Sequence, residues 1–120
     1  MLDWLRKQAE GVEWLTSVCT GSAILAAAGV LDGYRATSNK FSFDWVVKQG
    51  PKVDWVYEAR WVEDGNRMTS SGVTAGMDMA LALIAKLYGD ESADSVAKFT
   101  EYVCSKDASN DPFSGYFRRG

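Results

Sequence analysis

Residues 12–31 read VEWLTSVCTGSAILAAAGVL, and this stretch decides the fold into which the rest of the chain must fit. Its first part, residues 12–18, is rich in β-branched and aromatic residues and predicts a short buried strand. Residues 22–31 are apolar and rich in alanine, which favours a helix buried on most of its sides. A strand that passes directly into a helix predicts an α/β layer fold.

The junction between that strand and that helix has the pattern small-x-Cys-x-Gly, with Ser17, Cys19 and Gly21 at the fixed positions. This pattern is typical of a nucleophile elbow, a tight turn whose small neighbours leave the nucleophile exposed. We expect Gly21 to allow close approach of helix and strand, the helix start to favour a thiolate on Cys19, and the Thr20 N–H to face a developing anion. The alternative is that Cys19 is a small buried apolar residue.

Cys104 is the contrast to Cys19. Residues 91–104 predict an amphipathic helix, and Cys104 lies on its apolar side with no glycine and no helix start nearby. We therefore expect Cys104 to be a packing residue. The apolar stripe of this helix is expected to contain Val96, Phe99, Tyr102 and Val103.

A second polar stretch, residues 69–78 (TSSGVTAGMD), ends a predicted strand and leads into a long helix predicted over residues 74–88. One interpretation is a loop at the carboxyl ends of the strands that lines a pocket near Cys19. Its candidate binding residues are Ser70, Ser71, Gly72, Val73 and Thr74, and Gly21 beside the cysteine is a further candidate binding residue. The alternative is that Ser71 or Thr74 caps the helix, and we expect Asp78 to be an acid favoured by the helix dipole.

Shorter elements fill the rest of the chain. We expect helices over residues 2–10 and 41–48, and extended segments over residues 34–37, 53–57, 60–62 and 67–70. Asp64-Gly65-Asn66 predicts a hairpin turn, and Gly89 predicts a helix end. Because only about four short strands are expected and the first precedes the cysteine, residues 1–120 are interpreted as one partial domain, the C-terminal portion of a larger α/β unit.

Composition narrows the function classes. The chain has 120 residues with 16 acids, 13 bases and no basic run, which argues against a nucleic-acid surface. No apolar stretch approaches the roughly 20 residues of a membrane span. Because the chain has 0 histidines, it cannot by itself build a Ser-His-Asp triad, a Cys-His pair or a His-ligated zinc site. Its 2 cysteines form no disulfide framework, which favours a cytoplasmic location.

Residues 17–37 (SVCTGSAILAAAGVLDGYRAT) and residues 69–84 (TSSGVTAGMDMALALI) together resemble the DJ-1/PfpI superfamily, above all its isonitrile hydratase-like branch. Glutaminase-like sensor domains of AraC-type regulators are also similar. The resemblance implies a flavodoxin-like α/β sandwich, usually a homodimer, with Cys19 as nucleophile, Thr20 as a backbone donor, and no metal or organic cofactor. In that branch the cysteine attacks the terminal carbon of an isonitrile, and hydrolysis of the thioimidate releases an N-substituted formamide.

The sequence departs from the family pattern in ways that bear on chemistry. Family members are roughly twice as long, so we expect the early strands and the acidic partner of the cysteine to be absent from this portion. Asn39 stands where many relatives have histidine, and Thr20 stands where the protease-like branch has histidine. Both differences argue against protease-like chemistry, and Asn39 is a further candidate binding residue.

Three functions stay open at this point. The first is an isonitrile hydratase acting on a small-molecule substrate, with low activity expected in a chain that lacks the acid. The second is a non-catalytic, redox-responsive thiol protein of the DJ-1 type. The third is a ligand-sensing domain, which the lack of a helix-turn-helix pattern after Asp111 disfavours. A sheet cut beside its nucleophile strand has an open edge, so we expect a marginally stable chain that pairs with another.

Overall fold

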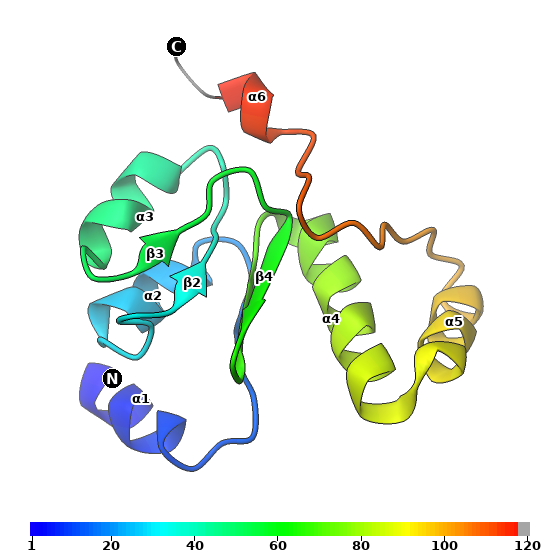
Figure 1. The fold of residues 1–120 in the computed structure, drawn as a ribbon, viewed down its shortest axis with the longest axis horizontal. Helices are drawn as coiled ribbons and strands as arrows, with labels where there is room; N and C mark the ends of the chain where they lie inside the picture. The colour runs from blue at the N-terminus through cyan, green and yellow to red at the C-terminus, as the bar shows by residue number, and fades with distance from the viewer. Residues whose placement is uncertain (118–120) are drawn as a thin grey trace.

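Helices lie on both sides of a small mixed sheet in the computed structural model, which describes residues 1–117 (Figure 1). Helices α1, α2 and α3 lie on one side of strand β4, and α4 and α5 lie on the other. The elements in chain order are α1 (Leu2–Ala9), β1 (Leu15–Ser17), α2 (Gly21–Ala27), β2 (Arg35–Ala36), α3 (Phe43–Gln49), β3 (Asp54–Trp55), β4 (Trp61–Asp64), β5 (Arg67–Ser70), α4 (Val73–Tyr88), α5 (Asp90–Phe99) and α6 (Ser114–Phe117). This is the α/β layer fold that the sequence predicts.

The main sheet has the strand order β1-β5-β4, so β1 lies at an edge of the sheet that residues 1–117 form. Strand β1 runs parallel to β5, with Ser17 opposite Thr69. Strand β5 runs antiparallel to β4, with Asp64 opposite Arg67, which confirms the predicted hairpin turn. Because β1 and β5 run parallel, α2 and α4, which follow them, begin at the same end of the sheet. This brings the two predicted site loops together.

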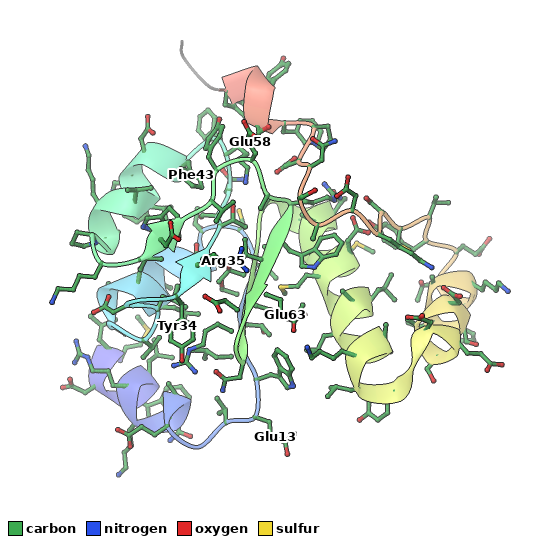
Figure 2. The ribbon with its side chains drawn as sticks, in the orientation of Figure 1. Glu13, Tyr34, Arg35, Phe43, Glu58 and Glu63 are labelled. Carbon is green, nitrogen blue, oxygen red and sulfur yellow. The ribbon has the colours of Figure 1, made fainter. Side chains whose placement is uncertain are left out.

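A second, two-stranded sheet of parallel β2 and β3 is tied to the first by Arg35, which lies beside β4 (Figure 2). The Arg35 main-chain N–H donates to the Asp64 carboxylate at 2.8 Å, and the Arg35 guanidinium donates to the Glu63 carbonyl at 3.3 Å. The chain that leaves β2 therefore runs towards the main sheet and carries residues 37–40 to the cysteine loop.

Two apolar clusters hold these layers. The first joins α2 to the second sheet around Leu25, Leu31 and Val53. The second packs α4 on the main sheet through Trp61, Met68 and Met79, with Trp14 and Leu83 among the partly buried residues at its edge. No helix within residues 1–117 is long and apolar enough to cross a membrane.

Several predicted elements are shorter in the structure. Only residues 15–17 of the predicted strand over 12–18 pair with β5. Helix α2 ends at Ala27 and not at residue 31, because the chain turns through Gly29 at a φ of 82°. Glycine tolerates this left-handed conformation, and its presence there ends the helix.

The helix predicted over residues 91–104 ends at Phe99, so Cys104 does not lie on a helix. Glu101 has a φ of 55°, which breaks the helical path, and the chain then runs back towards the sheet. The predicted stripe is also wrong. Phe99 and Val103 are more than nine-tenths exposed, and the buried residues of α5 are Ala93 and Ala97. Only small side chains fit here because α5 packs closely on α4.

Candidate active site

Cys19 has a left-handed backbone, with a φ of 58°, between the end of β1 and the start of α2. This conformation is uncommon for residues other than glycine and costs about 1–2 kcal/mol. The Cys19 N–H donates to the Ser71 carbonyl at 2.7 Å and to the Ser70 carbonyl at 3.2 Å. The Cys19 carbonyl accepts from the Ser38 hydroxyl at 3.0 Å, and the more distant Ser22 hydroxyl lies at 3.4 Å. These contacts hold the main chain of Cys19 in the tight turn.

The Cys19 side chain is partly exposed and stands just before the first turn of a helix. Thr20 is the N-cap residue of α2, is exposed, and makes no side-chain cap bond. The alternative of a fully buried apolar cysteine therefore does not describe this geometry. Cys104 is also partly exposed, and it lines a cavity of about 210 Å³ beside α4 and α5 with Trp61.

The close approach expected at Gly21 occurs at Gly76 instead. A Cβ atom on Gly21 would lie 3.5 Å from the Ser17 Cβ, which is an ordinary van der Waals contact. A Cβ atom on Gly76 would lie 2.6 and 2.9 Å from the two methyl groups of Val18. Helix α4 can therefore pass over the residue that precedes Cys19 only because position 76 is glycine.

Where β5 leads into α4, Ser70 joins two strands, and the residues after it do not cap the helix with their side chains. Ser70 is buried, and its hydroxyl donates to the Ser17 carbonyl at 3.2 Å, which ties β5 to β1. Helix α4 begins at Val73 with Gly72 as N-cap and no side-chain cap bond, so the interpretation of Ser71 or Thr74 as the cap is wrong. An extended Gly72 leaves the first N–H groups of α4 without a side-chain acceptor.

A cavity of about 230 Å³ lies beside this loop. Of the predicted binding residues it is lined by Asn39, Ser71, Gly72, Val73 and Thr74, and its walls also include Phe113 and Phe117. Gly21, Ser70, Cys19 and Thr20 are not among its lining residues. Ser71 lines the cavity and also accepts the Cys19 N–H through its carbonyl at 2.7 Å, so the cavity wall includes a residue that contacts the cysteine turn.

Asn39, the residue at the expected histidine position, is partly buried. Its side-chain oxygen accepts the Ser42 N–H at 3.1 Å, which shapes the loop before α3. A larger cavity, of about 890 Å³, lies on the other side of Lys40 between Phe41, Val47 and Tyr57. None of the predicted site residues lines it.

Asp78 is a buried anion and not the simple helix-dipole acid that the sequence suggests. It is 1% exposed, and its carboxylate accepts the Arg60 Nε–H at 2.7 Å, the Tyr102 hydroxyl at 2.9 Å and the Ser105 N–H at 3.1 Å. Burial and the neighbouring Asp78 carboxylate raise the pKa of the Tyr102 phenol. Through Tyr102 and Ser105, these hydrogen bonds hold the segment that follows α5 against α4.

A second buried ion pair, Lys40–Asp111, was missed by the sequence analysis. Lys40 Nζ lies 3.6 Å from the Asp111 carboxylate, and both side chains are at most 2% exposed. Burial lowers the pKa of Lys40 from 10.5 to about 8, against the opposing attraction of Asp111. For Asp78 a signal existed, since it shares the buried face of α4 with Ala75 and Met79. Lys40 and Asp111 are 71 positions apart along the sequence, and no local pattern links them.

The chemistry available at this site is that of a thiol. Within residues 1–117, no group of three or more histidine, cysteine or acidic residues could hold a metal ion. None of the carboxylates of that part of the chain hydrogen-bonds the Cys19 thiol, which stands just before the start of α2.

Comparisons with known proteins find related sequences. The sequence model of the DJ-1/PfpI family matches residues 1–86. An isonitrile hydratase from Pseudomonas putida is 44% identical over 104 residues, covering 85% of this chain and 43% of the hydratase. The transcriptional regulator CdhR from Pseudomonas aeruginosa is 38% identical over 98 residues, covering 82% of this chain and 29% of the regulator.

Solved structures give the same fold. A ThiJ/PfpI family protein from Pseudomonas syringae superposes with a TM-score of 0.76 at 38% identity, covering 87% of this chain and 42% of that protein. The chain thus spans less than half of the length of each of these three proteins.

Proposed function

The chain belongs to the DJ-1/PfpI family, with its flavodoxin-like α/β fold, and we propose that it carries the nucleophile of an isonitrile hydratase site. The observation that supports this most is the left-handed Cys19 between β1 and α2, bonded through its N–H to Ser71 and through its carbonyl to Ser38. The similarity to an isonitrile hydratase at 44% identity supports the same substrate class.

In the proposed reaction the Cys19 thiol adds to the terminal carbon of R–N≡C. An S–C bond forms and that carbon gains a proton, which gives the thioimidate R–N=CH–S–Cys. Water then adds to the same carbon, the S–C bond breaks, the thiol regains its proton, and R–NH–CHO leaves. The main-chain N–H of Thr20, at the start of α2, is our candidate donor to the charge that develops.

The proton donor for that carbon is a group that the described residues do not place at the thiol. Removal of a general acid typically slows such a step by about 10²–10⁴-fold. We therefore expect slow turnover by this chain alone. The 230 Å³ cavity lined by Asn39 and the Ser71–Thr74 loop is proposed to accept the R group, with Phe113 and Phe117 as its apolar wall. A homodimer and a cytoplasmic location remain predictions.

Formation of formamide from an aryl isonitrile tests the proposed function. We expect the wild-type chain and Cys104→Ser to produce N-aryl formamide at equal rates, and Cys19→Ala to produce it only at the rate of buffer. Chromatography with an authentic standard would quantify the product. Equal formation by Cys19→Ala and the wild type would eliminate the hydratase.

A redox-responsive thiol is the second candidate, and the partial exposure of the Cys19 side chain favours it. A thiolate at a helix start that is open to solvent is the form that peroxide oxidises first. Titration with hydrogen peroxide, followed by peptide mass spectrometry, should then show sulfenic or sulfinic acid on Cys19 before Cys104. Oxidation of both cysteines in parallel would remove this candidate.

A further inference from the structure

Lys40 is a buried cation next to the cysteine loop that the proposed reaction does not use. It is 4% exposed, and its ammonium donates to the Thr37 hydroxyl at 3.0 Å, the Ser38 carbonyl at 3.0 Å and the Ala59 carbonyl at 2.9 Å. Asp111 supplies the opposite charge at 3.6 Å. A lysine is rarely buried this completely unless its charge is paired and its protons are bonded.

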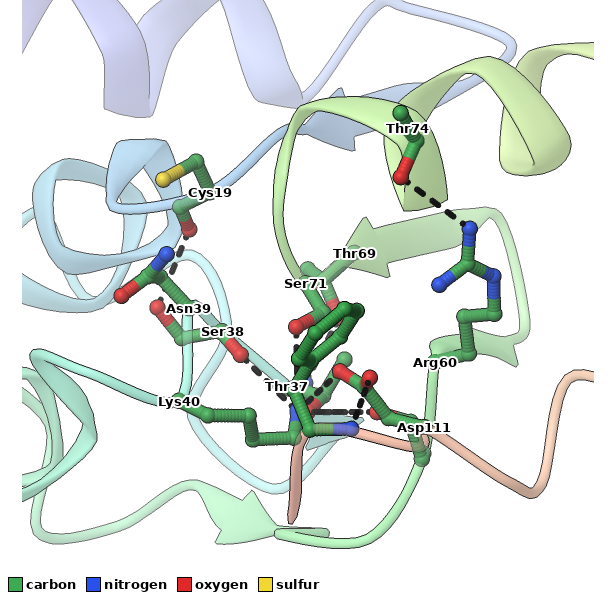
Figure 3. A network of polar contacts seen from close by, with 12 residues as sticks. Cys19, Thr37, Ser38, Asn39, Lys40, Arg60, Thr69, Ser71, Thr74 and Asp111 are labelled. Atoms are coloured by element: carbon green, nitrogen blue, oxygen red, sulfur yellow. Dashed lines mark hydrogen bonds and ion pairs between the residues drawn. The ribbon is translucent and has the colours of Figure 1, made fainter. Parts of the chain in front are cut away.

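Two of the groups around the ammonium belong to the residues that hold the main chain of Cys19. Ser38 donates its hydroxyl to the Cys19 carbonyl and offers its own carbonyl to Lys40. Ser71 accepts the Cys19 N–H through its carbonyl, and its hydroxyl lies 3.4 Å from Lys40 Nζ. Figure 3 shows Ser38 and Ser71 between Cys19 and Lys40. Lys40 therefore contacts both of the loops that bind the main-chain N–H and the carbonyl of Cys19.

Contacts of this kind can stabilise the left-handed backbone of Cys19. A left-handed cysteine persists only when its surroundings over-determine it, since the backbone of a residue other than glycine relaxes elsewhere if it is free to do so. The hydrogen bond that Ser38 donates and the one that the Ser71 carbonyl accepts have this effect only while those two residues keep their positions. Both lie in loops outside helices and strands, and Lys40 contacts both of them, beside the Thr37 N–H that donates to the Thr69 hydroxyl at 2.8 Å.

We propose that Lys40 is a positioning residue for Cys19, and that Asp111 supports it by neutralising the buried ammonium. Asp111 is itself held by its N–H, which donates to the Glu58 carbonyl at 2.8 Å. The segment after α5 thereby contributes to the geometry of a cysteine more than ninety positions earlier in the chain. The proposal concerns the reactivity of the thiol, and only its consequence for turnover rests on the proposed function.

The test is the rate at which iodoacetamide alkylates Cys19, measured by peptide mass spectrometry in a Cys104→Ser background. We expect Lys40→Met to lower this rate at least fivefold, because the turn relaxes and the thiol leaves the amides at the start of α2. Lys40→Arg, which keeps the charge, should recover part of the rate. Ser38→Ala removes the shorter of the two hydroxyl bonds to the Cys19 carbonyl, so a smaller decrease in the same direction is expected.

Val46→Ala is the matched control, because Val46 is fully buried in α3 and is not one of the residues that hydrogen-bond the Cys19 turn. It should lower the melting temperature and leave the alkylation rate within twofold of the parent. An equal decrease in Val46→Ala would assign the effect to general destabilisation and overturn the proposal. Unchanged rates in folded Lys40→Met and Ser38→Ala would overturn it as well.

The pH profile gives a readout that a purely structural role would not change. The groups that face the ammonium are Asp111 from the C-terminal segment, the ring of Tyr57 at 5.7 Å and, across the cavity wall, Arg60. Ionisation of the thiol raises the alkylation rate with pH in both proteins. We expect the parent to show, in addition, an inflection near the Lys40 pKa of about 8 that is absent in Lys40→Met. Superimposable profiles would contradict the role of Lys40. If no formamide forms but these rates change as expected, the proposed function fails and the positioning role stands.

Discussion

Replacement of Gly76 by alanine should disturb the turn at Cys19 without changing any polar group. The added Cβ would meet the two Val18 methyl groups at 2.6 and 2.9 Å, well inside normal contact distance. Val18 is β-branched and has a stiff side chain, so it cannot fold away by a simple rotation. Since Val18 precedes Cys19 directly, its displacement is passed to the elbow.

The size of the effect follows from two opposing contributions. Overpacking of this kind typically costs about 1–3 kcal/mol. Alanine is favoured over glycine by up to about 1 kcal/mol in a helix interior, and by less in the first turns where Gly76 lies. We therefore expect Gly76→Ala to lower the free energy of unfolding by about 1–2 kcal/mol, which corresponds to a melting temperature roughly 5–10 °C lower.

Thermal melts by circular dichroism and the Cys19 alkylation rate would measure both consequences. Gly11→Ala is the control, because a Cβ at that exposed loop position meets nothing within 4 Å. Its melting temperature should stay within about 2 °C of the parent, since such surface changes are typically within 0.5 kcal/mol. A Gly76→Ala variant as stable and as reactive as the parent would refute the close contact between α4 and Val18.

Three further results are expected. Asp78→Ala leaves the Arg60 guanidinium buried without its carboxylate, so urea unfolding should show a loss of about 3–5 kcal/mol in the free energy of unfolding. The double variant Arg60→Met, Asp78→Leu should recover most of that loss. Equal losses in the single and double variants would contradict the ion pair. In ultraviolet titration the Tyr102 phenol should ionise above its usual pKa, and Asp78→Asn should lower that value; no change would contradict the contact. Because the Lys40 pKa is about 8 in the folded protein and 10.5 unfolded, the folded state binds fewer protons between these values. Below pH 8 the titration of Lys40 should therefore not change the free energy of unfolding. Between pH 8 and pH 10.5 that free energy should rise by about 3 kcal/mol relative to Lys40→Met. Parallel plots of the free energy of unfolding against pH for the two proteins would refute this.

The elements around Cys19 could be predicted because their signals are local. The β-branched run before the cysteine, the alanine-rich helix after it and the Gly65-Asn66 turn each depend on neighbouring residues, and all three occur in the structure. Element ends were less predictable, since the end of α5 at Phe99 depends on Glu101 adopting a left-handed conformation that no residue preference indicates.

The supports of the site could not be predicted in the same way. Lys40 pairs with Asp111 only after loops distant in the sequence come together, and Arg60, 18 positions before Asp78, reaches it only once α4 packs on the sheet. Charged residues are ordinarily predicted to lie on the surface, so the few that are buried as ion pairs cannot be recognised from the sequence. The sequence places Gly76 inside a predicted helix, but it does not show that Gly76 lies against Val18. That contact depends on how α4 packs over the residue that follows β1.

The most direct test of the central claim is a competition between Cys19 and Cys104 for a limiting amount of iodoacetamide. Both thiols are partly exposed, but only Cys19 lies in a left-handed turn at a helix start. We predict that Cys19 is alkylated at least ten times faster than Cys104 in the folded protein, and that the two rates become equal in concentrated urea. A ratio near one in the folded protein would show that the turn confers no special reactivity on Cys19 and would contradict the account.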